Sequence, residues 1–378
     1  MGTAVGVNLL WLRPRRVGGS EDYAVRLLLA IADEGSLEIT LFAAKGFSRA
    51  YLDLATRFEV VTAPFVRFRI LRVFIENTWL AVQCKRRNIG VIHHLGGTVP
   101  LFGMQPALVT IHDLQPLDCP EHFGIIKRLW LRFMLPWAVR RAACVVTVSE
   151  YCRERISARL GVHADRIAVV PAPLQLPDEP VGSWLTAVQL DLAHPFLFYP
   201  AVTYPHKNHE VLLRALALLQ EQGVQVALVS TGIGGPLDEE LDRLADELEV
   251  GDCWHRLGRM SRPVMQRLYR QAVGLTFPSR YEGYGLPVVE AMVLGCPVLA
   301  ANVGAIREVV GSDGCLLDPD DPQAWAKAIV DLLDDSSKTS LRKRLIDAGT
   351  QRAQELATLE PAVELCALYE QVAHSQAA

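Results

Sequence analysis

Short apolar runs alternate along the chain with longer stretches of helical periodicity. In the first half the apolar runs predict strands near Val5–Leu10, Leu37–Phe42, Phe58–Thr62, Val91–His93, Leu108–Ile111 and Val145–Val148. The periodic stretches between them predict helices, among them Asp22–Glu34, Ile75–Arg87 and Ile125–Arg141. Alternation of this kind favours a parallel sheet that is covered by helices on both faces.

A proline-rich break between Val170 and Pro180 ends this first series of elements. The alternation then restarts, with predicted strands at Phe196–Tyr199, Val224–Ser230, Cys253–Leu257, Gly274–Phe277 and Pro297–Ala300. A chain of 378 residues suits two domains of about 150–200 residues each. We therefore expect an α/β protein with two doubly wound, Rossmann-like domains, residues 1–175 and 190–360, and a ligand cleft at the carboxyl ends of the strands.

Charge is distributed unevenly between the two halves. The chain has 38 basic and 42 acidic side chains, a net charge of −4. Residues 1–180 hold 22 basic and 16 acidic side chains (+6), which leaves 16 and 26 (−10) for residues 181–378. The first half is therefore the better candidate for an anionic partner such as a membrane surface or a phosphorylated acceptor, and we expect no nucleic-acid partner.

The eight cysteines form no C-x-x-C pair and do not cluster with histidines. This spacing argues against a zinc site or a disulfide framework and favours a reducing compartment. No signal peptide is evident, and the longest unbroken apolar run, Ala291–Ala301, is about half of the roughly 20 residues that a spanning helix needs. We expect a cytoplasmic protein, with peripheral contact to the inner membrane face as an option.

The most informative segment runs from Pro278 to Met292. It places Glu282 and Glu290 on either side of a glycine-rich turn that follows an apolar strand and opens a helix, with Pro287 in the first helical turn. The unpaired amides and the positive dipole end of a helix start suit a diphosphate, which the backbone of Gly283, Tyr284, Gly285 and Leu286 would bind. A ribose diol is the natural partner for Glu290. A helix with merely solvated glutamates would not explain Gly-x-Gly-x-Pro between them.

This segment resembles the signature of the retaining glycosyltransferases of family 4, the glycosyl transferases group 1, with Tyr284 where the family has phenylalanine. The resemblance implies the GT-B fold, in which two Rossmann-like domains face a central cleft. It also implies that the N-terminal domain binds the acceptor, that the C-terminal domain binds a nucleotide sugar, and that a last helix within residues 361–378 packs back onto the N-terminal domain.

A second candidate group follows the first strand of the second domain, in Tyr199–His209. Lys207, at a loop-to-helix switch, can offset charge on a departing nucleoside diphosphate, and the family has a lysine motif here. Many relatives carry an arginine six positions earlier, where this chain has Ala201, and His206, Thr203 or Arg280 could substitute. Without the other motifs, the run Tyr199–His209 would be interpreted as an ordinary polar helix start that is capped by asparagine.

Two further motifs lie in the first half. Gly18 and Gly19, between a strand and a helix, let a ligand approach the backbone, although a tight turn is the favoured explanation of two glycines taken alone. His112, after the strand Leu108–Ile111, can hydrogen-bond a sugar hydroxyl or shuttle a proton near neutral pH, or be a core histidine. The resemblance places the glycines beside the donor phosphate and the acceptor, and His112 beside the transferred sugar. Asp113 could simply cap a turn.

Two motifs have simpler explanations. The run Asp318-Pro319-Asp320 resembles a metal-binding Asp-x-Asp, but it precedes a predicted helix at Pro322–Leu333 that Asp320 or Asp321 would cap. We therefore expect no essential metal. The run Gly232–Gly235 resembles half of a dinucleotide loop but lacks its full spacing and its acidic residue.

Basic and aromatic residues gather in the first half, in the run Pro64–Phe74 and at Lys127, Arg128, Trp130, Arg132, Arg140 and Arg141. They could form a surface that binds anionic lipid. Arginines that extend from a helix face along apolar surface are the commoner explanation.

Together these features predict a retaining, metal-independent hexosyltransferase in cell-surface polysaccharide, lipopolysaccharide or glycolipid biosynthesis. The expected catalytic residues are Glu282, His112 and Lys207, and the substrates are a nucleoside-diphosphate sugar and a saccharide or lipid-linked saccharide. The runs Pro205–His209 and His112–Leu114 resemble those of family members that use GDP-mannose, and this resemblance favours GDP-mannose over UDP-sugars. No cofactor is expected. The alternatives are a nucleotide-sugar epimerase of the same fold and a non-catalytic sugar-nucleotide-binding protein.

Overall fold

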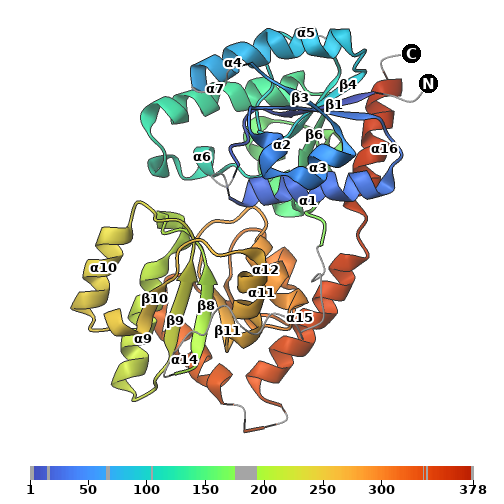
Figure 1. Ribbon diagram of the computed structural model, residues 1–378. Coiled ribbons are helices and arrows are strands. Elements are labelled where there is room, and N and C mark those ends of the chain that lie inside the picture. The colour runs from blue at the N-terminus through green and yellow to red at the C-terminus, as the bar shows by residue number, and fades with distance from the viewer. Residues whose placement is uncertain are drawn as a thin grey trace. The chain divides into compact units, whose positions relative to one another are not determined.

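The computed structural model of the chain describes residues 4–14, 18–64, 69–103, 105–174, 194–334, 336–337 and 339–375. The chain divides into two compact units. The first comprises Met1–Leu174 together with Leu359–Ala378, and the second comprises Gln175–Thr358. Each unit is built on one parallel sheet (Figure 1).

The sheet of the first unit has the strand order β3-β2-β1-β4-β5-β6-β7, with every pairing parallel. Its strands are β1 (Val5–Leu9), β2 (Ile39–Ala43), β3 (Glu59–Thr62), β4 (Val91–His94), β5 (Ala107–Thr110), β6 (Cys144–Thr147) and β7 (Ile167–Val169). All residues of β1, β2, β4, β5 and β6 are buried, whereas the edge strand β3 is partly exposed. Strands that are buried on both faces require the unbroken apolar runs that the sequence shows.

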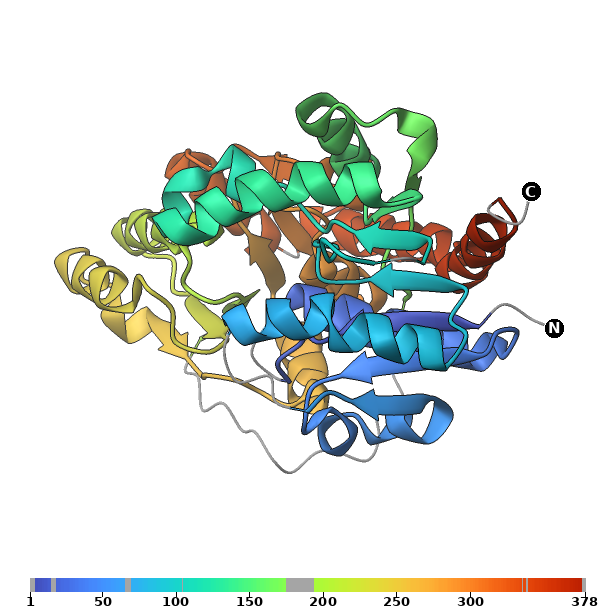
Figure 2. The same ribbon diagram turned by 90° about the horizontal axis from the view of Figure 1, so that it is seen from above.

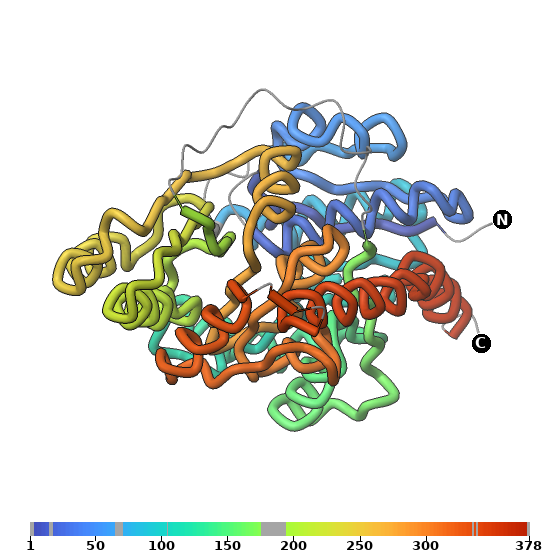
Figure 3. The backbone as a smooth tube through the Cα atoms, turned by 90° about the horizontal axis from the view of Figure 1, so that it is seen from below, coloured from blue at the N-terminus to red at the C-terminus, as the bar shows by residue number. Residues whose placement is uncertain are grey.

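Helices cover both faces of this sheet. They are α1 (Gly19–Glu34), α2 (Phe47–Ala50), α3 (Leu52–Arg57), α4 (Arg69–Asn77), α5 (Trp79–Arg86), α6 (Gln115–Asp118), α7 (Ile125–Arg141), α8 (Glu150–Leu160) and the C-terminal α16 (Pro361–His374), with 3₁₀ turns η1 (Pro120–His122) and η2 (Ala164–Arg166). Buried residues of α5, α7 and α8 share one core with the central strands, and α4, α5 and α7 can be followed from above in Figure 2. The helix α16 packs against α1 and β4, as the red and blue ends of the backbone show in Figure 3.

The sheet of the second unit has the strand order β10-β9-β8-β11-β12-β13, again with parallel pairings. Its strands are β8 (Phe196–Pro200), β9 (Ala227–Thr231), β10 (Trp254–Arg256), β11 (Gly274–Phe277), β12 (Val298–Ala301) and β13 (Cys315–Leu317). Its helices are α9 (His209–Glu221), α10 (Asp238–Glu247), α11 (Arg262–Gln271), α12 (Leu286–Val293), α13 (Ile306–Val310), α14 (Pro322–Leu333) and α15 (Leu341–Ala357), with 3₁₀ turns η3 (Pro205–Lys207) and η4 (Gly251–Cys253).

Local chemistry fixes several helix ends. The side chains of Ser149 and Asp321 accept hydrogen bonds from amides in the first turns of α8 and α14. At their C-terminal ends, α1 and α8 are followed by Gly35 and Gly161 in the left-handed conformation, which glycine adopts at little cost.

The prediction of two doubly wound parallel sheets is confirmed. One predicted helix, Ile75–Arg87, is wrong: α4 and α5 are separate because Thr78 leaves the helical conformation. The Thr78 hydroxyl donates to the carbonyl of Phe74 at 2.7 Å, a local bond of the kind by which threonine competes with helix continuation. Among the described residues, no helix combines the length and the apolar character that crossing a bilayer requires.

Candidate functional site

The candidate site of the second unit lies where the order of its strands reverses. The strands β8 and β11 are neighbours in the sheet, but the chain continues from β8 towards β9 on one side and from β11 towards β12 on the other. Ligands of open α/β sheets bind at such a reversal, beyond the carboxyl ends of the strands. Lys207 follows β8 and Glu282 follows β11, so the two predicted residues lie on the two loops that flank this point.

Lys207 and Glu282 form an ion pair, with Nζ of the lysine 2.5 Å from Oε1 of the glutamate. The side chains are 20 % and 13 % exposed, so solvent screens the pair less than it would a surface pair. The ammonium group also lies 5.5 Å from the ring centre of Phe277, the last residue of β11. The structure thus brings together two residues that are 75 positions apart in the sequence.

Two hydrogen bonds join the loops that carry this pair, and a third ties one of these loops to β8. The amide of Arg280 donates to the carbonyl of His206 at 2.7 Å, and the Asn208 side chain donates to the carbonyl of Pro278 at 3.2 Å. The hydroxyl of Tyr199 donates to the carbonyl of Lys207 at 2.6 Å. These bonds fix the backbone next to the pair and so hold the two loops within reach of each other.

Sequence reasoning missed the positioning role of Tyr199. This residue lies in β8 and is fully buried, and a buried tyrosine hydroxyl requires a hydrogen-bond partner. A tyrosine inside an otherwise apolar strand was therefore the signal, although the sequence could not say which carbonyl accepts the bond.

The glycine turn after Glu282 opens α12 as predicted. Gly285 precedes the helix with a φ of 107°, and a Cβ at this position would lie 2.6 Å from Cδ1 of Ile306. Glycine is therefore required here both for its backbone conformation and for space. Gly283, Tyr284 and Leu286 are partly exposed, which leaves the start of α12 accessible to an anion.

Glu290 lies in the middle of α12 and is held by a residue that the sequence did not suggest. The hydroxyl of Tyr269, on α11, donates to Oε2 of Glu290 at 3.1 Å. The Tyr269 ring is 1 % exposed and packs edge-on against Phe198 with centroids 4.9 Å apart. Tyr269 therefore acts as a fixed donor that orients the Glu290 carboxylate.

The structure separates the three residues that could replace the arginine expected at Ala201. Thr203 is 5 % exposed, and its hydroxyl donates to the Asp238 carboxylate, so it is committed to the protein interior. Arg280 forms an exposed pair with Asp320 at 2.7 Å, a type of contact that contributes little and exchanges readily. The backbone amide of Arg280 donates to the carbonyl of His206, so the two remaining candidates, Arg280 and His206, both lie on the loops that carry the ion pair.

Of the two motifs with simpler explanations, the aspartate run behaves as expected, and the structure gives one glycine of the other a packing role. Asp321 caps α14 by accepting a hydrogen bond from the amide of Ala324 at 3.0 Å. Gly235 lies against the backbone and hydroxyl of Thr203, and a Cβ there would overlap Thr203. This glycine therefore serves close packing between two loops of the second unit.

In the first unit, Gly18 and Gly19 stand at the start of α1, after β1. Gly18 has a φ of 88°, and no heavy atom of the described residues lies within 4 Å of a Cβ built on either glycine. The positive φ explains why position 18 is a glycine, and the open space lets a ligand approach the backbone of both glycines closely. Their predicted role beside the donor phosphate stays a prediction.

His112 follows β5 and is partly buried. Its Nε2 donates to the carbonyl of Leu95 at 3.2 Å, and its ring packs edge-on against Tyr23 with centroids 5.0 Å apart. Burial lowers the pKa of His112 to about 4, despite the opposing effect of the Leu95 carbonyl. The ring is therefore neutral at pH 7 with its proton on Nε2, so Nδ1 can accept a hydrogen bond. This favours the sugar-hydroxyl role over the proton shuttle.

Asp113, next to His112, caps a turn. Its Oδ1 accepts a hydrogen bond from the amide of Gln115 at 3.0 Å, at the start of α6. The turn cap that the sequence suggested for this residue is therefore present.

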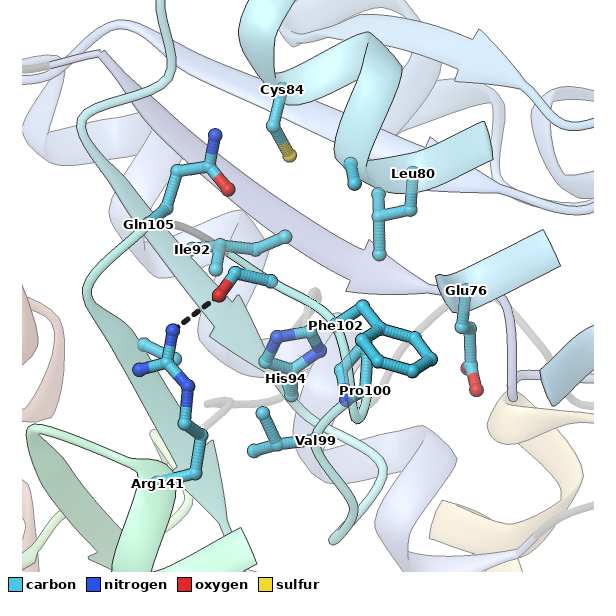
Figure 4. Close-up of a pocket in the computed structure, with 13 residues that line it drawn as sticks. Glu76, Leu80, Cys84, Ile92, His94, Val99, Pro100, Phe102, Gln105 and Arg141 are labelled. Atoms are coloured by element: carbon cyan, nitrogen blue, oxygen red, sulfur yellow. Dashed lines mark hydrogen bonds between the residues drawn. The ribbon is translucent and has the colours of Figure 1, made fainter. Parts of the chain in front are cut away.

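A small cavity lies within the first unit, between α5 and the loop after β4 (Figure 4). Its volume is about 20 Å³, which accommodates roughly one water molecule and excludes a nucleotide sugar. Glu76 and His94 line it, as does Arg141, which donates to the carbonyl of Gly103. Burial, followed by the Arg141 guanidinium, lowers the pKa of His94 to about 3, and the Asn8 side chain lies 3.0 Å from its Nδ1.

Comparisons with known proteins cover both units. Residues 17–176 match the family described as Glycosyltransferase Family 4, and residues 186–352 match that described as Glycosyl transferases group 1. The O-antigen chain mannosyltransferase RfbU of Salmonella typhimurium is 25% identical over 327 residues, which cover 82% of this chain and 86% of that protein. The O-antigen chain mannosyltransferase B of Escherichia coli is 31% identical over 240 residues, which cover 62% and 63%.

The fold resembles a solved structure along its whole length. The sucrose-phosphate synthase from Thermosynechococcus elongatus superposes with a TM-score of 0.77 at 21% identity, and the match covers 99% of this chain and 100% of that one. At this identity the likeness concerns the fold alone.

Proposed function

Because the chain joins a family 4 domain to a group 1 domain in the GT-B fold and so belongs to these glycosyltransferases, we propose that it is a retaining hexosyltransferase. It would move a hexose from a nucleoside-diphosphate sugar to a hydroxyl of a saccharide or a lipid-linked saccharide. The relatives named as O-antigen chain mannosyltransferases favour mannose, with GDP-mannose as donor, and a role in cell-surface polysaccharide or lipopolysaccharide synthesis.

The observation that carries the proposal is the ion pair of Lys207 and Glu282 at the strand reversal of the second sheet. An ammonium group beside a helix start matches the charge of a diphosphate. In the proposed complex, Lys207 and the amides at the start of α12 neutralise the diphosphate without a metal ion. Glu290 binds the ribose diol, and Glu282 binds hydroxyls of the sugar.

The proposed reaction retains the configuration at the anomeric carbon. The bond from this carbon to the phosphate oxygen breaks as the acceptor oxygen bonds to the same face, and the acceptor proton passes to the departing phosphate oxygen. Lys207 would stabilise the charge that develops on the diphosphate. Nδ1 of His112 would accept a hydrogen bond from a sugar hydroxyl, a role that its lowered pKa supports.

A lipid-linked acceptor would bring the protein to a membrane. Peripheral contact through the first unit, on the cytoplasmic face, is therefore part of the proposal, and the surplus of basic residues in the first 180 positions supports it.

The decisive experiment measures nucleoside-diphosphate release from GDP-mannose, UDP-glucose and UDP-N-acetylglucosamine, with and without an extract that supplies acceptors. We expect GDP-mannose to be turned over and the rate to rise with the extract and to persist in a chelator. The Lys207→Ala and Glu282→Gln variants should each lose roughly 100-fold or more in kcat/KM. The Lys327→Ala variant, which removes an exposed lysine of the same unit, is the matched control.

The same panel separates the alternatives. An epimerase would convert the donor without any acceptor, and a non-catalytic binding protein would bind the donor and release no diphosphate. Full transfer by Glu282→Gln would contradict the assignment of the site.

A further inference from the structure

The helix α7 carries large apolar side chains on its solvent side. Ile126 is 83 % exposed, Phe133 62 % and Leu129 59 %, and the neighbouring Ile125 and Trp130 are exposed as well. Single exposed apolar residues are normal on protein surfaces, but five within nine consecutive residues make a continuous patch. Such a patch indicates a binding surface.

The patch has helical geometry. At about 100° per residue, Ile126, Leu129, Trp130 and Phe133 fall within roughly 100° of the helix circumference. We call these four residues the α7 ridge. The core contacts of α7 come from other residues, mainly Met134, Leu135, Ala138 and Val139 in its second half. The ridge is therefore not needed for packing within the first unit.

Charge identifies the partner that fits the ridge. The helix α7 contains Lys127, Arg128, Arg132, Arg140 and Arg141 and no acidic residue. On the helix circumference, Lys127 lies on one side of the ridge and Arg132 on the other. An apolar stripe between basic side chains matches the boundary between lipid head groups and acyl chains in an anionic membrane.

The exposed fractions also decide between the two explanations that the sequence allowed. Arginines that extend along apolar surface would cover that surface and reduce its exposure. The ridge residues instead remain exposed between the arginines. Extended arginines therefore account for the basic residues but not for the ridge.

We propose that the α7 ridge inserts into the interfacial region of an anionic bilayer, while Lys127 and Arg132, which flank it, bind lipid phosphates. This inference identifies the segment through which the protein contacts a membrane. The test of membrane binding does not depend on hexose transfer. The membrane proposal can therefore fail while the proposed reaction stands, and the proposed reaction can fail while membrane binding stands.

The test is cosedimentation of the full chain with vesicles of phosphatidylcholine alone or with about one third phosphatidylglycerol. We expect binding to the anionic vesicles that weakens at high salt. Arg132→Gln should reduce the partition constant about fivefold on anionic vesicles. Leu129→Glu combined with Phe133→Glu should reduce it at least tenfold on the same vesicles.

A control variant and a direct probe accompany these measurements. Leu52→Glu removes a leucine of α3 that is 66 % exposed and lies outside α7, and it should bind vesicles like the unaltered protein. Trp130 should be quenched by brominated lipid, and Trp130→Phe should remove that part of the quenching. Because the altered residues are exposed, unchanged melting temperatures are expected and verify folding.

Two outcomes would overturn the proposal. One is a full chain that stays in the supernatant with anionic vesicles. The other is unchanged vesicle binding by the Leu129 and Phe133 double variant; if that variant instead dissociates an oligomer, the ridge is an interface between copies of this chain.

Discussion

The hydroxyl of Tyr269 determines how Glu290 can meet a ligand. Glu290 is on a helix surface and partly exposed, where a carboxylate would normally sample several rotamers. The hydrogen bond from the buried Tyr269 selects one of them. If Glu290 binds the ribose, this contact reduces the entropy that is lost when the donor binds.

Tyr269→Phe tests this relation. The variant keeps the ring and its packing against Phe198 but removes the donor to Glu290. Because a hydrogen bond to a charged group contributes about 1.5 kcal/mol, we expect the KM for the donor to rise about tenfold while kcat changes little. Steady-state kinetics at varied donor concentration measure both. An unchanged KM would show that Tyr269 serves packing alone.

At the level of elements, α12 depends on the glycines that flank it. Gly285 at its start and Gly295 beyond its end both have positive φ, 107° and 68°. They differ in surroundings, because a Cβ at Gly285 meets Ile306 whereas one at Gly295 meets no atom within 4 Å in the part of the chain that the structure describes. Only Gly285 belongs to the turn that is proposed to bind the diphosphate.

Gly285→Ala and Gly295→Ala therefore form a matched pair. Each should destabilise the protein by about 1–2 kcal/mol, because alanine resists the left-handed conformation, with the larger loss at Gly285. Titration calorimetry should detect weakened donor binding only for Gly285→Ala. Equal affinities of the two variants for the donor would argue against a diphosphate site at the start of α12.

The elements also show what a sequence can predict. The bounds of α7, α14 and β11 were predicted as the structure has them, since each combines clear periodicity or an apolar run with a cap, a proline or a turn at its ends. The strand β7 was missed, because its three residues run directly into the proline-rich break that was interpreted as the end of the first series of elements. The break at Thr78 was missed because the apolar periodicity continues through it.

The candidate site was predictable to a similar extent. Lys207, Glu282 and Glu290 were predicted from local motifs, because an anion site at a helix start has a local sequence requirement. Their partners Tyr199 and Tyr269 were not predicted. These residues act across the fold, from β8 and α11, and no local pattern encodes which loop or helix they will meet.

For the whole molecule, buried histidines make stability depend on pH. His93 joins β4 to α16: its Nδ1 lies 2.7 Å from the Tyr369 hydroxyl, and its Nε2 lies 2.7 Å from the Thr110 hydroxyl. Burial lowers the pKa of His93 and of His94 to about 3. The pKa values of both histidines are thus lower in the folded protein than in the unfolded chain. Their neutral side chains therefore stabilise the fold fully above about pH 6.5, and this stabilisation is lost as the pH falls.

We therefore expect the unfolding free energy to decrease between about pH 7 and pH 5, by roughly 2 kcal/mol for each such histidine. Glu76 acts in the opposite direction, because burial raises its pKa and its contribution is lost as the pH rises. Urea unfolding at several pH values measures the slope of the unfolding free energy against pH. His93→Gln should reduce the slope, whereas His163→Gln, at a side chain that is 76 % exposed, should leave it unchanged. A flat profile would contradict the expectation.

The first unit is completed only by the last part of the chain, because α16 supplies Tyr369 to His93 and packs on α1. The second unit is thus an insertion within the first. During synthesis, residues 175–358 leave the ribosome before α16 does. The second unit can therefore acquire its structure while the first unit still lacks its final helix, so premature termination near residue 358 would yield a folded second unit beside an incomplete first unit.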